Sequence, residues 1–106
     1  MSLDVSPDGA EIAFDLLGDI YRLPINGGRA TRLLGGLSFD SQPRVSPDGK
    51  RIAFVSDKSG SDNVWTMSLD GRDTTQVTKG NIIGVSSPEW TPDGRGIVVT
   101  RAGTGP

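Results

Sequence analysis

The chain has 106 residues, of which 34% are apolar and 23% charged, and its net charge is −2. It contains no cysteine and no histidine, which excludes disulfides, thiolate nucleophiles, serine–histidine pairs and the usual zinc ligand sets. The sequence lacks the stripe of basic residues that is typical of nucleic-acid binders. Its longest apolar runs, such as residues 52–55, are too short to insert into a membrane.

A four-residue motif near the start of the chain occurs three times. Ser6–Gly9 and Ser46–Gly49 both read Ser-Pro-Asp-Gly, and Thr91–Gly94 differs from them only in its hydroxyl residue. Proline pre-sets φ for a turn, aspartate bonds nearby backbone amides, and glycine adopts the left-handed conformation that closes a hairpin. The repeat therefore predicts strand pairs joined at Pro7-Asp8, Pro47-Asp48 and Pro92-Asp93.

The segments that follow each motif also repeat. Residues 12–14, 52–55 and 97–99 are apolar on both faces, which is typical of a strand packed between neighbouring sheets. A second strand alternates in residues 21–25 and again in residues 65–69. Asn26-Gly27 and Asp70-Gly71 then predict hairpin turns that lead into outer strands near residues 30–34 and 74–78.

One unit thus consists of four strands joined by short turns, at the spacing of a propeller blade. Residues 3–36 and 37–80 are each expected to form a complete four-stranded sheet, and residues 81–106 only the first hairpin of a third. The second copy is four residues longer around residues 57–62, where a hairpin tip tolerates added length. The predicted fold class is all-β, a β-propeller fragment of about two and a half blades that forms one partial propeller over residues 1–106.

These motifs carry a family resemblance. The Ser-Pro-Asp-Gly turn, the Ile-Ala-Phe strand, the Asp57–Gly60 tip and the aromatic strand before Asp-Gly resemble TolB-like propeller repeats over essentially the whole chain. More narrowly, Gly18–Tyr21 with Phe39–Pro43 is similar to the propeller region that precedes the catalytic domain in some bacterial amidohydrolase-related proteins. That resemblance implies six or more blades and a periplasmic or exported location. The chain shows no signal segment and stops before any such catalytic domain.

Several acidic residues are candidate sites. Residues 57–63 carry oxygen-bearing side chains at alternate positions, as a calcium loop does, but Asp62 replaces the glycine and Ser68 the glutamate of that pattern. A solvated hairpin loop explains the segment better. Three aspartates could form a carboxylate pair for acid–base chemistry or could instead accept hydrogen bonds from backbone amides: Asp15, Asp19 and Asp40. We favour the second role, because sequence spacing alone does not bring two carboxylates together. A structural role is expected for the aspartates that recur in every turn: Asp8, Asp48 and Asp93.

The aromatic residues are candidates for stacking on a sugar or peptide ligand. Tyr21 and Trp65 occupy equivalent positions, which favours packing between blades, and Trp90 stands where the other copies have Val5 and Val45, so it too is expected in the core. Weaker candidates for a channel or rim surface are Arg22, Arg44 and Glu89.

No catalytic, cofactor-binding or metal-binding residue is assigned, no cofactor is expected, and the binding residues are left open. The leading hypothesis is a non-catalytic scaffold or binding module for a protein, peptide or glycan partner, within a larger exported protein. The alternative is the propeller part of an amidohydrolase-like hydrolase whose catalytic domain lies outside this chain. Because an unclosed array exposes apolar surface at both ends, self-association through the open blade ends is expected.

Overall fold

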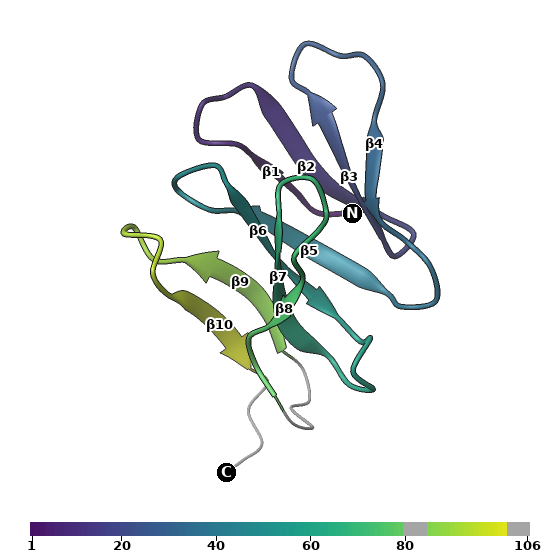
Figure 1. Cartoon of the computed structure of the whole chain (residues 1–106), viewed down its shortest axis with the longest axis vertical. Helices are drawn as coiled ribbons and strands as arrows, with labels where there is room; N and C mark the ends of the chain where they lie inside the picture. The colour runs from purple at the N-terminus through teal and green to yellow at the C-terminus, as the bar shows by residue number, and fades with distance from the viewer. Residues whose placement is uncertain (80–84, 102–106) are drawn as a thin grey trace.

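Ten β-strands make up the regular structure of residues 1–79 and 85–101, which are the residues that the computed structural model describes. They form two four-stranded sheets and a two-stranded hairpin, stacked in chain order (Figure 1). Within these described ranges there is no helix, and hence none that is long and apolar enough to cross a membrane. The prediction of an all-β chain is confirmed.

The first sheet contains β1 (Leu3–Val5), β2 (Glu11–Leu16), β3 (Asp19–Pro24) and β4 (Thr31–Leu34). The second contains β5 (Asp40–Val45), β6 (Arg51–Ser56), β7 (Asn63–Ser68) and β8 (Thr75–Gln76). In both sheets sequential strands pair antiparallel. The outer strand β8 is shorter than the expected 74–78.

The third unit is a hairpin of β9 (Val85–Trp90) and β10 (Ile97–Arg101). The boundary expected between residues 80 and 81, and the end of the expected third unit at 102–106, lie outside the described residues. Strands β1, β5 and β9, the first of each unit, lie next to one another and form the inner edges of the stack.

The three proline–aspartate–glycine turns join β1 to β2, β5 to β6 and β9 to β10, as predicted. In each turn the glycine amide donates to the carbonyl of the hydroxyl residue, at 2.9, 2.8 and 2.8 Å. The glycines have φ angles of 72, 74 and 72°, which a residue with a Cβ adopts only with strain. The same backbone is therefore built three times from the same residues.

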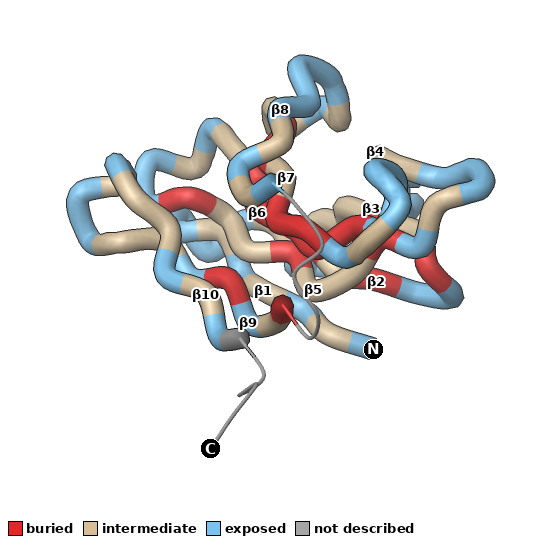
Figure 2. Tube along the Cα trace, turned by 90° about the horizontal axis from the view of Figure 1, so that it is seen from below, coloured by how far each residue is buried: buried red, intermediate tan, exposed pale blue. Residues whose placement is uncertain are grey.

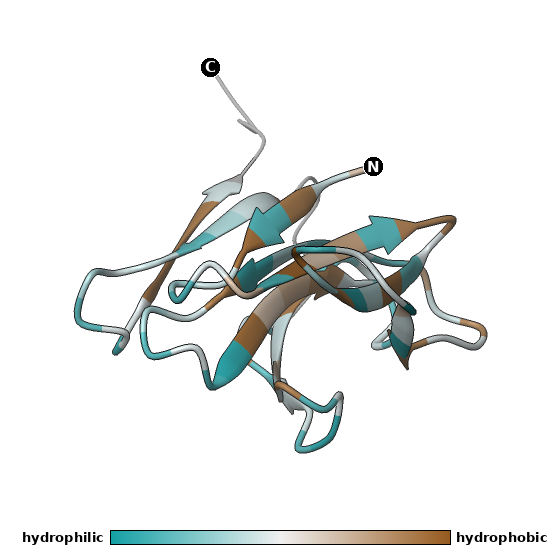
Figure 3. Ribbon diagram, turned by 90° about the horizontal axis from the view of Figure 1, so that it is seen from above, coloured by the Kyte–Doolittle hydropathy of each residue, from teal (hydrophilic) through white to brown (hydrophobic). Residues whose placement is uncertain are grey.

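The core lies between the first two sheets. Ala13 and Ile20 of the first sheet pack against Ile52, Phe54 and Met67 of the second, and all five side chains are almost fully buried. Figure 2 shows the buried residues along the central strands, and Figure 3 shows hydrophobic residues mainly in strands and hydrophilic ones in most loops. The opposite face of the second sheet, with Ala53 and Val55, is buried on the side of the third hairpin, where β6 contacts β9. The second sheet is thus covered on both faces.

The β2–β3 hairpin contains an unfavourable residue. Leu16 pairs with Asp19, so Leu17-Gly18 forms a two-residue loop whose φ angles are both positive, at 53 and 84°. Such loops favour glycine, which has no Cβ to crowd the following carbonyl oxygen, and asparagine, whose short polar side chain offsets that strain by local hydrogen bonding. The Leu17 side chain is also 92% exposed, so burial does not offset that strain.

Replacing Leu17 with asparagine should therefore stabilise the protein, by about 1 kcal/mol. Chemical denaturation of the wild type and Leu17→Asn measures the change. Leu37→Asn is the matched control, because Leu37 is also fully exposed but is not among the residues with positive φ. Equal stability of wild type and Leu17→Asn would show that the strain is relieved elsewhere.

Candidate binding groove at the inner edge of the sheets

One charged residue of each inner strand occupies the same register position. Asp4 lies opposite Ala13, Arg44 opposite Ala53 and Glu89 opposite Val98. Each stands two residues before the hydroxyl residue of its turn. Because β1, β5 and β9 are neighbours, this position creates a row of negative, positive and negative side chains along the inner edges.

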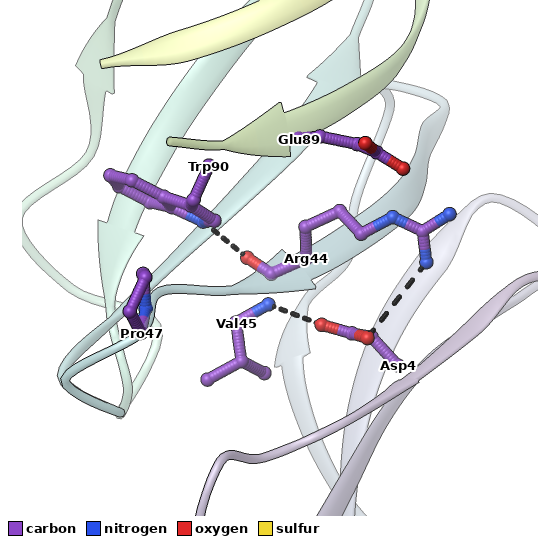
Figure 4. Close-up of a pocket in the computed structure, with 6 residues that line it drawn as sticks. All are labelled: Asp4, Arg44, Val45, Pro47, Glu89 and Trp90. Carbon is purple, nitrogen blue, oxygen red and sulfur yellow. Dashed lines mark hydrogen bonds and ion pairs between the residues drawn. The ribbon is translucent and has the colours of Figure 1, made fainter. Parts of the chain in front are cut away.

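The central cation of this row is held by the first sheet. The Arg44 guanidinium lies 4.0 Å from the Asp4 carboxylate, and its Nη1 donates to the Leu3 carbonyl at 3.3 Å. The other Asp4 oxygen accepts the Val45 amide at 2.7 Å. Figure 4 shows the Arg44 side chain directed toward Asp4, with Glu89 beside it. Glu89 is exposed and, within the described part of the chain, is in no ion pair.

Trp90 forms the other wall of the groove. Its indole Nε1 donates to the Arg44 carbonyl at 2.9 Å, which fixes the ring across the gap between β9 and β5 (Figure 4). The expectation that Trp90 belongs to the core is wrong, because Trp90 lines this groove and, unlike Trp65, is not among the residues packed against the core cluster. An indole is much larger than the valine of the other copies, and its N–H needs an acceptor, which the neighbouring inner strand supplies.

Together these residues line a shallow, open groove of about 450 Å³; its lining consists of Asp4, Arg44, Val45, Pro47, Glu89 and Trp90. It offers an aromatic surface, a guanidinium and two carboxylates within one concave site. Such a set can stack against an apolar group and pair with polar groups of a peptide or a saccharide.

A second set of contacts fixes the inner strands relative to each other. Gln42 and Ser87 stand at the same place in β5 and β9, and both have positive φ, at 55 and 51°. This conformation coincides with a register shift in each strand pairing. The backbone amide of Gln42 donates to Asp15 Oδ2 at 2.8 Å. The backbone amide of Ser87 donates to the side-chain oxygen Oε1 of Gln42 at 2.5 Å. Each strand is therefore bound by a side chain of the preceding sheet.

The three aspartates that are candidates for acid–base chemistry have separate partners. Asp15 is buried and accepts the amides of Ser2 and Gln42. Asp40 is buried and accepts the Ser38 hydroxyl, whereas Asp19 pairs with exposed Arg32 at 3.7 Å. No interaction of the described residues joins two of these carboxylates. Their arrangement fits the structural role.

The aspartates of the three turns bind their own turn. Asp8, Asp48 and Asp93 each accept a hydroxyl at 2.6 Å and the amide two residues further along. The hydroxyl bond is the main cause, and the amide bond the second, that lowers the pKa of each carboxyl below its ordinary 3.8. Since these bonds stabilise the ionised form, their contribution to stability is present above that ordinary pKa. It is lost as the pH falls through the lowered one.

The loop at residues 57–63 packs against the rest of the protein through Asp57 and Lys58. Asp57 accepts the Phe39 amide at 2.8 Å, and Lys58 Nζ lies over the rings of Phe54 and Trp65, at 5.5 and 5.1 Å. No group of three acidic residues that could hold a metal ion exists among the residues described. The loop thus connects β6 to β7 and covers the aromatic core.

The remaining candidates lie away from the groove. Trp65 packs against the core cluster, and Tyr21 stacks on Phe14 with ring centres 5.4 Å apart. Arg22 reaches between the sheets, where its Nη1 donates to the Leu69 carbonyl at 2.9 Å. The groove residue that the sequence did not single out is Asp4, although its place two residues before the turn matches Arg44 and Glu89.

Comparison with known proteins identifies the architecture. Residues 3–105 match the family described as the Tricorn protease N-terminal β-propeller domain. Tricorn protease homolog 1 of Streptomyces coelicolor is 31% identical over 97 residues, which are 92% of this chain and 9% of that protein. The uncharacterised peptidase YuxL of Bacillus subtilis is 43% identical over 106 residues, covering 90% of this chain and 16% of that protein.

Solved structures agree. A putative TolB from Agrobacterium tumefaciens superposes with a TM-score of 0.78 at 30% identity, over 93% of this chain and 38% of that one. The predicted propeller class is therefore confirmed. The chain spans only a small part of the relatives named above. None of the proteins named above is described as an amidohydrolase, so the comparisons do not show that part of the resemblance.

Asp15 should be the most consequential of the candidate aspartates for stability. Replacing it with alanine leaves the amides of Ser2 and Gln42 without their acceptor at a buried site, which should cost about 2 to 3 kcal/mol of unfolding free energy. Asp19→Ala is the matched control, because it removes only an exposed ion pair and should cost under about 1 kcal/mol. Chemical denaturation measures both, and equal losses would contradict the role of Asp15.

Proposed function

This chain belongs to the Tricorn protease N-terminal β-propeller family, and we propose that it is a non-catalytic module that binds a peptide or protein segment along its inner edge. The observation that carries the proposal is the groove between β1, β5 and β9. Its indole ring, its guanidinium and the Asp4 carboxylate are held in place by contacts between successive sheets. Binding groups on rigid strands are positioned more accurately than groups on loops.

The chemistry of the groove favours a peptide. A peptide presents carbonyl and amide groups for Arg44 and Glu89 and apolar side chains for Trp90, and one segment can engage all three. A small anion is disfavoured, because carboxylates flank the single guanidinium on both sides. A glycan is the competing ligand, since it also stacks on aromatic rings.

Peptide binding also agrees with the names of the relatives, two of which are a Tricorn protease homolog and a peptidase. We infer that the chain serves a longer, peptidase-type polypeptide whose bond-cleaving residues lie outside it. An amidohydrolase parent lacks such support. The structural likeness to a putative TolB supports an exported or periplasmic protein.

The two tryptophans provide an internal control for a binding experiment. Trp90 lines the groove, whereas the Trp65 indole Nε1 is buried between the sheets. The probe is an equimolar mixture of random-sequence hexapeptides, added to the ¹⁵N-labelled chain. We expect the Trp90 indole signal to shift with peptide concentration while the Trp65 signal stays in place, and the peptides to remain intact by mass spectrometry.

Arg44→Ala should abolish the shift, and Arg72→Ala, at an exposed site away from the groove, should preserve it. A shift produced by an oligosaccharide mixture but not by the peptides would replace the peptide with a glycan. A Trp90 signal that responds to neither would contradict the proposal, as would cleavage of the peptides by the purified chain.

A further inference from the structure

The candidate groove has an apolar half and a charged half, which lie at opposite sides of Figure 4. The apolar half consists of Val45, Pro47 and Trp90, and the charged half consists of the ends of Asp4, Arg44 and Glu89. A ligand side chain that suits both halves is long, apolar along its stem and charged at its end. Lysine and arginine have this build, and glutamate is a shorter anionic counterpart. The sign of the charge in the groove decides between them.

The charged half carries an excess of negative charge. It contains two carboxylates and one guanidinium, which leaves one net negative charge. The Arg44 guanidinium lies 4.0 Å from the Asp4 carboxylate and donates to the Leu3 carbonyl, so it is drawn toward β1. Among the residues described, Glu89 has no cation within ion-pair distance. A ligand cation is therefore attracted to this half, and a ligand carboxylate is repelled.

Trp90 offers the face of its ring to a ligand. Its indole N–H donates to the Arg44 carbonyl at 2.9 Å, so the side chain has no donor left for a ligand. What remains is an apolar surface whose π electrons attract cations. The chain contains an example of this contact, since Lys58 Nζ lies 5.1 Å from the centre of the Trp65 ring. No lysine or arginine of the described ranges lies over the Trp90 ring in this way, which leaves that ring to a cation of the ligand.

The groove opens on the inner edges of β1, β5 and β9, whereas successive sheets pack on one another through their faces. Sheets placed before β1 or after β10 in a longer polypeptide would cover those faces and leave the inner edges open. The contacts that orient Arg44 and Trp90 lie between these three strands of the chain itself. The shape of the groove is therefore set within the chain.

We propose that the groove selects peptide segments that contain a lysine or an arginine. The stem of that residue lies along Trp90 and Pro47, and its cation lies among the groups of the charged half. The inference rests on the proposed peptide-binding function and adds to it the class of side chain that is preferred. Because the carboxylates are open to solvent, the preference is strongest at low ionic strength and weakens as salt screens them.

Three peptides of equal length test this selectivity. Each is a hexapeptide of alanines, acetylated and amidated, in which one central residue is replaced by lysine, glutamine or glutamate. They are titrated at low salt into the ¹⁵N-labelled chain, and the shift of the Trp90 indole signal gives each dissociation constant. We expect the lysine peptide to bind about tenfold more tightly than the glutamine peptide, and the glutamate peptide to bind most weakly. High salt should reduce the difference between lysine and glutamine.

Variants of one carboxylate show whether the groove causes the preference. Glu89→Gln removes a charge from the groove and keeps the length of the side chain, so it should reduce the preference for lysine severalfold. Glu89→Lys should reverse the order, so that the glutamate peptide binds more tightly than the lysine peptide. Asp62→Asn is the matched control, because it removes the same charge at an exposed loop residue outside the groove and should keep the wild-type preference.

The outcomes separate this inference from the proposed function. Equal affinity of the lysine and glutamine peptides contradicts the inference and leaves peptide binding intact. A preference that Asp62→Asn lowers as much as Glu89→Gln also contradicts it, because such a preference reflects the charge of the whole chain. A Trp90 signal that responds to none of the three peptides contradicts peptide binding itself, and this inference with it.

Discussion

The arrangement of this chain depends on backbone amides that their own sheets leave unpaired. At Gln42 and Ser87 the backbone turns left-handed, the register of the strand pairing shifts, and the amide points away from its sheet. The Gln42 amide is partly buried, where an unpaired N–H costs free energy, whereas Ser87 is exposed and the cost there is smaller. Each one is therefore satisfied by the preceding sheet, through Asp15 in one case and the Gln42 side chain in the other. The left-handed backbone at each of these two residues therefore directs the amide that forms the hydrogen bond to the preceding sheet.

The candidate binding groove is a consequence of these contacts. They hold β1, β5 and β9 side by side, so that the equivalent residues Asp4, Arg44 and Glu89 form one row. Hydrophobic burial alone is non-directional and does not specify how the inner edges align. The directional bonds of the Val45 amide and the Trp90 indole supply that alignment. A chain built in this way presents polar groups at fixed positions along its inner edge.

Much of the fold can be predicted from the sequence, because its determinants are local. A proline, an aspartate and a glycine within four residues specify each turn, and the three copies reveal the blade period. The four consecutive apolar residues at 52–55 likewise predict a strand that is buried on both faces. The contacts between sheets are not local. The Gln42 backbone amide binds Asp15, which is 27 residues away in the sequence. In the second sheet the position equivalent to Asp15 is occupied by Val55, which is not an acid.

That substitution explains why the candidate site was only partly foreseen. Because the side chain that caps the amide changes position from one sheet to the next, aligning the repeats does not reveal it. Trp90 was misplaced for a related reason, since a valine in the other copies suggests a core position. The charged row, in contrast, keeps its distance from the turn in all three copies, and Asp4 could have been found from that spacing.

Hydrogen exchange at Gln42 and Ser87 tests most directly whether side chains of one sheet hold the amides of the next. Gln42→Asn tolerates the left-handed backbone but shortens the side chain that reaches Ser87. Exchange at the Ser87 amide should accelerate by about tenfold, while the Gln42 amide, still bound by Asp15, keeps its protection. Unchanged exchange at Ser87, or equal acceleration at both amides, would contradict the account.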